Sequence, residues 1–441
     1  MGSFALRRDA FALLALGLAA PAWGLSLSAA VHQALETNPS VLSAARNQQA
    51  ADASIGVARG SYFPRLDVLV GEGREHSKNA ATISFGRDWV PLNRHEELVL
   101  LSQTLWDGLG TKSEVERRRA LAESSAYRLR GTAEDVAMQA INAYLEVVRN
   151  RELLAYANDN LNAHASAYRQ VSLHGEGAAG SRADLEQMET RLALAKSNVA
   201  LAQNALIDAE TAFRTVVGET PVDLSDPSSD EKAVPESVEQ AIQIAYDHHP
   251  LLKSAKADID AADAQRRGAR SPFYPRIDLE LSASDNKNID GLPFPDRERA
   301  AMLRLRWNLF RGGADSSHLA ETAQQVGEVG EIAKRTRRQV ESAVRLGYSA
   351  YQAARERLPL LEQYVIWSDK TRQAYAKQFV TGQQTLVNLL NSENEYYSAR
   401  SAYINARSSE TNARYRVLFA MGDLLDALGI AVPEAAIVGK K

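Results

Sequence analysis

The residues of this 441-residue chain that come nearest to a chemical motif are glycines. Residues 175–180 read Gly-Glu-Gly-Ala-Ala-Gly, which is the glycine spacing of a dinucleotide-binding loop. Such a loop binds a pyrophosphate only where a strand enters the glycine turn and a helix leaves it. Here a long helical pattern enters the turn, so the sequence favours a connection between two helices over a nucleotide site.

Other reactive side chains lack the spacing of a catalytic or metal site. The eight histidines are scattered, and the adjacent pair His248 and His249 precedes Pro250, as at a helix end. No serine lies in a nucleophile-elbow motif, and the chain has no cysteine. Arginine clusters at 117–119 and 335–338 lie among acids at helical spacing, which is typical of a solvated helix face. The sequence therefore predicts no enzyme, cofactor, metal or nucleic-acid partner.

Residues 1–24 have the features of a secretory signal peptide. Arg7 and Arg8 precede the apolar stretch 11–20, which is too short to span a membrane as a helix. Small residues offer cleavage after Ala22 or Gly24, and we favour Gly24 because a helical pattern begins directly after it. The sequence thus predicts an exported mature chain that starts near residue 25.

The mature chain is predicted to be an internal duplication. Residues 26–68 align with 237–279 without gaps, and 15 of the 43 positions are identical, where composition alone gives roughly three to five. The same order returns downstream in three pairs, which are Leu105-Trp106-Asp107-Gly108 with Leu309-Phe310-Arg311-Gly312, Tyr144 with Tyr348, and Gly218 with Gly422.

Each repeat reads as a helical region, a strand pair and two long helices. The long helices cover about 110–173 and 314–379, the second interrupted by Pro359, and the returning helices cover about 182–217 and 385–420. At about 1.5 Å per residue the first is about 95 Å long. We expect a first repeat at 25–217 with strands at about 62–72 and 96–106, a linker at 218–235, a second repeat at 236–422 with strands at about 273–284 and 299–310, and a C-terminal tail at 423–441.

The second strand pair alternates between apolar and polar residues, which predicts two distinct faces. Ser282 belongs to the polar face. Strands of about ten residues suit a tilted membrane-spanning strand, so we expect the apolar face to contact lipid. The apolar face carries Ile277, Leu279 and Leu281 on one strand and Leu303 and Leu305 on the other.

Aromatic residues lie at the helix-side ends of the expected strands. As core residues they would need no comment, but strand pairs that start and finish on the helix side place all of them on one rim. An aromatic girdle at a membrane interface is then the favoured interpretation. The residues are Tyr62, Phe63, Trp106, Phe273, Tyr274, Trp307 and Phe310.

With these features the chain resembles the TolC family of outer-membrane channels over its whole mature length. The resemblance rests on the segments 25–39, 58–64 and 105–108, on their second copies, and on 388–400. It implies a mainly α-helical, internally duplicated chain that gives four strands to a twelve-stranded barrel in a homotrimer, and long helices to a coiled-coil barrel in the periplasm. It also implies outer-membrane lipid, a periplasmic adaptor and an inner-membrane transporter, of the ABC or resistance-nodulation type, as partners.

The resemblance also implies a periplasmic entrance at the helix tips. TolC-like channels often carry two aspartates three residues apart there, but this chain has Asn388 and Asn391, so strong cation preference is in doubt. The first repeat has Asp184 and Gln187 at the equivalent place, and Gln384 stands where an arginine partner for Asp184 is expected. The turns expected to dock the adaptor contain Gly175, Gly177 and Gly180 in the first repeat and Thr381 and Gly382 in the second.

Two export functions fit the resemblance. The first is type I secretion of a toxin or adhesin, and it is favoured because the chain lacks the lipidated cysteine that many drug-efflux outer-membrane factors carry. The second is small-molecule efflux. A coiled-coil structural protein without a channel is a third alternative, which the two-faced strands disfavour.

Overall fold

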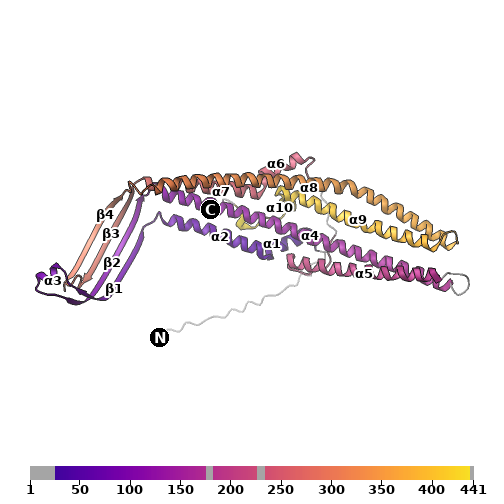
Figure 1. The fold of residues 1–441 in the computed structure, drawn as a ribbon, viewed down its shortest axis with the longest axis horizontal. Coiled ribbons are helices and arrows are strands. Elements are labelled where there is room, and N and C mark those ends of the chain that lie inside the picture. The colour runs from indigo at the N-terminus through magenta and orange to yellow at the C-terminus, as the bar shows by residue number, and fades with distance from the viewer. Residues whose placement is uncertain (1–24, 175–181, 226–233, 438–441) are drawn as a thin grey trace, which may run out of the picture.

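The computed structural model describes residues 25–174, 182–225 and 234–437. A four-stranded antiparallel sheet occupies one end, and long helices run from it to two hairpin tips at the other end (Figure 1). The elements in chain order are α1 (Leu27–Thr37), α2 (Pro39–Gly60), β1 (Arg65–Ser77), α3 (Ala80–Ser84), β2 (Val90–Trp106), α4 (Gly110–His174), α5 (Arg182–Val217), α6 (Val238–His248), α7 (Pro250–Gly268), the 3₁₀ turn η2 (Ser271–Phe273), β3 (Arg276–Lys287), β4 (Pro295–Arg306), α8 (Ala314–Val380), α9 (Leu386–Met421), α10 (Leu424–Ala427) and the 3₁₀ turn η3 (Glu434–Ala436).

The two repeats start their second helices in the same way. Asn38 precedes Pro39, and its side-chain oxygen accepts a hydrogen bond from the backbone N–H of Ser40 at 2.9 Å. His249 precedes Pro250, and its Nδ1 accepts from the backbone N–H of Leu251 at 3.2 Å. Proline at the first helical position needs no hydrogen bond, and the residue before it caps the helix. His249 thus caps the start of α7 and His248 is the last residue of α6, in agreement with the helix-end interpretation.

One tyrosine in each repeat hydrogen-bonds to the backbone at the beginning of that repeat. The hydroxyl of Tyr144 on α4 donates to the backbone oxygen of Leu25 at 2.8 Å. The hydroxyl of Tyr348 on α8 lies 2.7 Å from the backbone oxygen of Glu236. The two tyrosines occupy equivalent positions of the repeats in the sequence. In the structure each hydroxyl contacts the backbone at the start of its own repeat.

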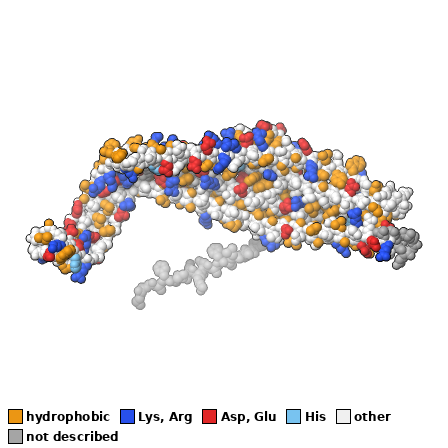
Figure 2. Space-filling model, in the orientation of Figure 1, with side chains coloured by type: hydrophobic (Ala, Val, Ile, Leu, Met, Phe, Trp, Pro, Cys, Tyr) orange, Lys and Arg blue, Asp and Glu red, His pale blue; other side chains and the backbone are white. Residues whose placement is uncertain are grey.

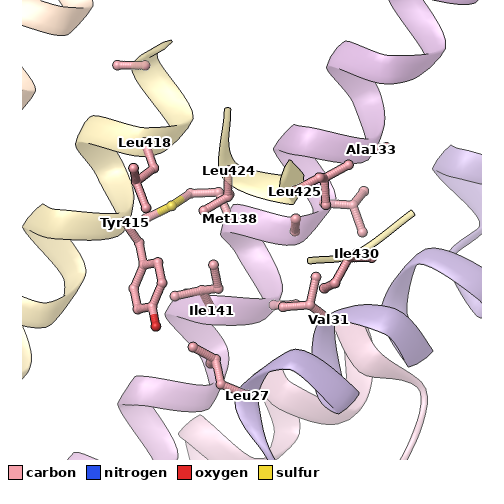
Figure 3. Packing of buried hydrophobic residues seen from close by; sticks show 14 of the residues in the cluster. Leu27, Val31, Ala133, Met138, Ile141, Tyr415, Leu418, Leu424, Leu425 and Ile430 are labelled. Atoms are coloured by element: carbon pink, nitrogen blue, oxygen red, sulfur yellow. The ribbon is translucent and has the colours of Figure 1, made fainter. Parts of the chain in front are cut away.

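The core joins elements from both repeats and the C-terminal segment (Figure 3). Leu424 and Leu425 of α10 are fully buried against Met138 and Ile141 of α4 and Val31 of α1. The segment expected to be a tail is therefore part of the core over residues 424–436. Part of the expected linker is also packed, because Leu224 forms a parallel bridge with Leu25.

The helices continue where a break was expected. Pro359 lies inside α8, and the helix runs through it from Ala314 to Val380. A proline removes only one intrahelical hydrogen bond, and α8 packs along α9, so tertiary packing overrides the local preference. The expected interruption is wrong. None of the described helices is both long and apolar enough to cross a lipid bilayer.

β1, β3 and β4 are shifted away from the helices relative to the expected ranges, whereas β2 ends at Trp106 as expected and is longer at its other end. Tyr62 and Phe63 lie before β1, in a turn where their N–H groups bond to the oxygens of Arg59 and Gly60 at 2.9 and 3.0 Å. Phe273 lies in η2, and Trp307 follows β4. The aromatic residues therefore border the sheet and are mostly outside its ladder. At the far end β1 and β2 run on to residues 77 and 90, where α3 closes their connection.

Candidate functional site

The hairpin tip between α8 and α9 is a tight turn that positions Asn388. Thr381 ends α8, and Gly382 has a φ of 74°, which a residue without a side chain adopts readily. Thr385 caps α9 by accepting from the backbone N–H of Asn388 at 3.3 Å. The Asn388 side-chain amide donates to Gln384 Oε1 at 2.7 Å. The polar groups of this tip thus bond to one another within the turn.

Asn391 contacts the other hairpin. Its Oδ1 accepts a hydrogen bond from Nη2 of Arg191 on α5 at 3.1 Å. The contact joins two exposed side chains that are 200 positions apart in the sequence. Arg191 was not among the expected entrance residues, and a positive charge beside Asn391 is the opposite of a carboxylate ring.

A small apolar cluster holds the two hairpins together near these polar groups. Met188 of α5 and Leu390 of α9 are fully buried, and Leu386 joins them. Arg191 lies three residues beyond Met188, and Asn391 directly follows Leu390, so burial of the cluster brings the hydrogen-bonding pair together. No pattern local to one helix identifies this arginine, because its partner lies 200 positions away in the sequence.

The remaining expected entrance residues lie in the first turns of α5. Asp184 and Gln187 are both half-buried there. Gly175, Gly177 and Gly180 lie outside the described residues. The docking turn of the second repeat, with Thr381 and Gly382, is exposed at the tip.

Two titratable side chains, His164 and Glu393, lie farther along the helices from the proposed entrance. His164 of α4 is buried, and burial lowers the pKa of its imidazole, with a further lowering from the Arg191 guanidinium. Burial raises the pKa of the Glu393 carboxyl on α9, and Arg372 of α8, 3.4 Å away, opposes that rise. Arg191 therefore contacts the Asn391 amide and, together with burial, favours the neutral form of the His164 imidazole.

The sheet presents the expected apolar residues on one face. Direct cross-strand partners point to the same side of a sheet. Leu305 pairs with Ile277, Leu303 with Leu279, and Ala301 with Leu281. Ser282 pairs with Ala300, one step out of phase with this set, and so belongs to the opposite face.

The aromatic residues lie together at the helix side of the sheet and are exposed. Phe310 is 84% exposed and Phe63 is 70% exposed, which a core position does not allow. Trp307 Nε1 donates to the backbone oxygen of Phe273 at 3.3 Å, which links the ends of β4 and η2. All seven expected aromatic residues, namely Tyr62, Phe63, Trp106, Phe273, Tyr274, Trp307 and Phe310, have exposed side chains.

A model of the family described as "Outer membrane efflux protein" matches residues 30–219 and 241–423. The chain belongs to this family. It is 23% identical to Outer membrane efflux protein BepC of Brucella suis biovar 1 over 411 residues, which cover 93% of this chain and 88% of BepC. It is 22% identical over 435 residues to the Alkaline protease secretion protein AprF of Pseudomonas aeruginosa, which cover 96% of this chain and 87% of AprF.

The fold is that of solved channels of this type. The crystal structure of the Campylobacter jejuni CmeC outer membrane channel superimposes with a TM-score of 0.80 at 15% identity, over 90% of this chain and 86% of CmeC. The TolC-like resemblance and the fold class of long helical hairpins with four antiparallel strands are thereby confirmed. The family is one of outer-membrane efflux channels, so the alternative of a coiled-coil protein without a channel is not supported.

Family membership also places the protein. It is an outer-membrane efflux channel component of tripartite systems, with its helical part in the periplasm. TolC-like channels are homotrimers that work with adaptor proteins and inner-membrane transporters.

Proposed function

We propose that this chain forms the outer-membrane exit duct for a secreted protein, a toxin or adhesin delivered by type I secretion. An inner-membrane ABC transporter and a periplasmic adaptor would deliver the cargo to the helix tips. The protein-secretion function is supported by the likeness to AprF, whose name is that of a protease secretion protein and which spans nearly the whole chain.

The observation that carries the duct is the continuity of two helices from the sheet to the tips. α4 has 65 residues and α8 has 67, which at about 1.5 Å per residue makes each about 100 Å long. One continuous element thus links a sheet with a lipid-compatible face to a polar tip. The two repeats at 25–217 and 236–422, joined by the linker 218–235, each supply one such element.

Closure into a trimer is supported by the free edges of the chain. The sheet order β1-β2-β3-β4 leaves one edge of β1 and one edge of β4 without partners. An unpaired strand edge in lipid leaves polar groups unsatisfied, so β4 of one copy would pair with β1 of the next, giving twelve strands. α8 carries an exposed row of Leu346, Leu360 and Trp367 at multiples of seven residues, which is the pattern of a helix that packs against another helix.

The entrance would be formed by Asn388 and Asn391 from each copy, with Asp184, Gln187 and Gln384 nearby. Its chemistry in this chain is amide and guanidinium, because Arg191 reaches Asn391. Charged rings select ions by sign, and this arrangement offers no carboxylate ring at the asparagines. The turns with Thr381 and Gly382, and with Gly175, Gly177 and Gly180, would meet the adaptor.

Small-molecule efflux is the second candidate, together with a transporter of the resistance-nodulation type. It is supported by the likeness to BepC, an outer membrane efflux protein that is 23% identical to this chain. The two candidates share the duct and differ in cargo and in transporter.

Deletion of the gene separates them. We expect the deletion strain to lose one or a few proteins from the culture medium and to regain them when the gene is restored, with unchanged susceptibility to drugs and detergents. Increased drug susceptibility with an unchanged set of secreted proteins would reject protein secretion in favour of small-molecule efflux.

A further inference from the structure

The outward face of the sheet, which is the face that carries Leu303 and Leu305, changes from apolar to charged part-way along the strands. Because cross-strand partners share a face, the register defines successive rows across the four strands. The rows nearest the helices are apolar except for Gln103, which pairs with Leu279, and one of them joins Leu66, Leu101 and Leu281 with Ala301. The next row joins Val68, Val99 and Ala283 with Arg299 on β4. The apolar band therefore ends first on β4.

Beyond this band the same face is charged. The row after Arg299 contains Glu97, Asp285 and Arg297 beside Val70, and the following row contains Glu72, His95 and Lys287 beside Pro295. Arg74 follows on β1. A face meant for the hydrocarbon interior would not carry these groups, so they mark the level at which the sheet leaves it. This sheet end points away from the periplasmic helices (Figure 1), and hence toward the outer leaflet.

The acidic side chains of these charged rows, which are Glu72, Glu97 and Asp285, already have partners within the chain. Asp285 accepts from Arg297 at 2.9 Å. His95 lies between Glu72 and Glu97, with nitrogen–oxygen distances of 2.6 and 3.0 Å. In the described part of the chain no ion pair involves Arg74, Lys287 or Arg299, and all three side chains are exposed.

On the outward face of the β3–β4 hairpin, basic side chains outnumber acidic ones. This face carries Lys287, Arg297 and Arg299 against the single acid Asp285. The inward face of the same hairpin is balanced, because Arg306 lies 3.0 Å from Asp278 and Arg304 pairs with Glu280. The surplus of positive charge is thus specific to the face that carries the apolar band. Figure 2 shows basic, acidic and hydrophobic side chains close together along the sheet end of the molecule.

We propose that Lys287, Arg297 and Arg299 bind the phosphate groups of anionic lipids in the outer leaflet. Guanidinium groups match phosphate oxygens in pairs, and basic residues beside an apolar surface attract anionic lipid headgroups. The apolar band fixes the acyl chains of a bound lipid directly below these side chains, so one lipid contacts both. The inference rests on the proposed lipid-facing orientation of Leu303 and Leu305.

The test measures which lipids remain bound to the purified full-length protein. Detergent-solubilised protein is incubated with equal amounts of phosphatidylglycerol and phosphatidylcholine of the same acyl chains, and bound lipid is counted by native mass spectrometry. The wild-type protein should retain phosphatidylglycerol in preference by roughly fivefold or more, since each basic side chain near a lipid surface contributes about that factor. Lipid A with two phosphates should be preferred over lipid A with one.

The decisive variant is Lys287→Gln/Arg297→Gln/Arg299→Gln, and its matched control is Arg304→Gln/Arg306→Gln on the inward face. We expect the triple variant to lose the preference and the control to keep it. Retention of the preference in the triple variant, or its equal loss in both variants, would overturn the proposal.

Two further outcomes separate other roles for these cations. Loss of the oligomer in the triple variant with an unchanged lipid preference would assign the side chains to contacts between copies and overturn the proposal. Millimolar inorganic phosphate should leave the lipid preference intact. If phosphate abolishes that preference completely, the site would be assigned to the free ion instead. Export by cells that carry the triple variant should persist, so a failed lipid test leaves the duct function standing, whereas an unchanged set of secreted proteins in the deletion strain bears on the duct function alone.

Discussion

At the scale of residues, the proposed entrance has the side-chain amides of Asn388 and Asn391, and Arg191 bonds to Asn391. Changing Asn388 and Asn391 to aspartate should make the channel more cation-selective and more sensitive to divalent cations, because it adds two carboxylates to each copy. The structure ranks the single variants. Asn391→Asp gives a carboxylate that pairs with Arg191, whose Nη2 lies 3.1 Å from Asn391 Oδ1, so Asn388→Asp should have the larger effect. Single-channel recordings give the selectivity and the divalent block.

Asn394→Asp is the matched control, because it makes the same change on an exposed residue one turn farther from the tip. It should alter selectivity less than Asn388→Asp. Equal effects of Asn394→Asp and Asn388→Asp, or none from either, would place the constriction elsewhere.

A second residue-scale prediction concerns Glu134, which fastens the C-terminal segment. This carboxylate is 2% exposed, and its Oε2 accepts from the backbone N–H of Leu424 at 3.1 Å. Burial raises the pKa of Glu134 to about 7, although Arg130 opposes the rise, and Asp426, 2.6 Å from Arg130, adds to it. The folded protein therefore holds this proton more tightly than the unfolded chain does. Its contribution to stability is complete below the ordinary glutamate pKa and is lost as the pH rises through about 7.

The loss should amount to roughly 3 kcal/mol by pH 8, an order-of-magnitude figure for a shift of this size. Glu134→Gln should therefore raise the thermal midpoint of the purified protein at pH 8 and change it little at pH 5. The exposed Glu356→Gln is the control and should leave the pH dependence as it is. A midpoint that falls at pH 8 in Glu134→Gln would mean that the charged carboxylate stabilises the fold.

At the scale of elements, the register of β3 and β4 assigns the two faces of the sheet. Leu305 pairs with Ile277 on the apolar face, and Ser282 belongs to the opposite face. Leu305→Arg puts a charge on the lipid-facing side, where the cost is about 2–4 kcal/mol at the bilayer midplane and less toward the rim, and should reduce the amount of assembled trimer. Ser282→Arg introduces the same side chain toward the lumen and should be mild. Semi-native electrophoresis of membrane extracts compares them, and equal damage from both would contradict the facing assignment.

The long elements were predictable because their patterns are long. α5 occupies the residues expected for it, 182–217, and α4 ends one residue beyond its expected range. The interruption predicted at Pro359 was wrong because the missing hydrogen bond of a proline is a local signal. The packing of α8 along α9, which favours a continuous helix, is not visible in the sequence. The outer parts of β1 and β2 were missed since their residues, such as Arg74 and His95, are polar or charged on a face that is apolar nearer the helices.

The candidate site was predictable only in part. Spacing placed Asn388 and Asn391 at the start of α9, and the structure agrees with that position. Arg191 was missed because its contact joins residues 200 positions apart, and no local pattern encodes such a pairing. The buried Met188 and Leu390 that cause the contact look like ordinary stripe residues in the sequence.

At the scale of the whole molecule, the described part of a single chain leaves strand edges and apolar side chains without a partner surface. Its sheet ends in two free edges, and α8 exposes Leu346, Leu360 and Trp367. Sheet and hairpin tips lie at opposite ends of the molecule (Figure 1), so a passage between them must run along the helices. The proposed duct therefore requires several copies of the chain.

The conductance of the purified mature protein in a planar bilayer tests this account most directly. The account predicts that a species with the mass of three chains inserts and gives discrete steps of ion current, and that Leu305→Arg, which reduces assembly, reduces the number of such insertions. A stable three-chain species that inserts into the bilayer but carries no current under any applied voltage would contradict it, as would current from single chains.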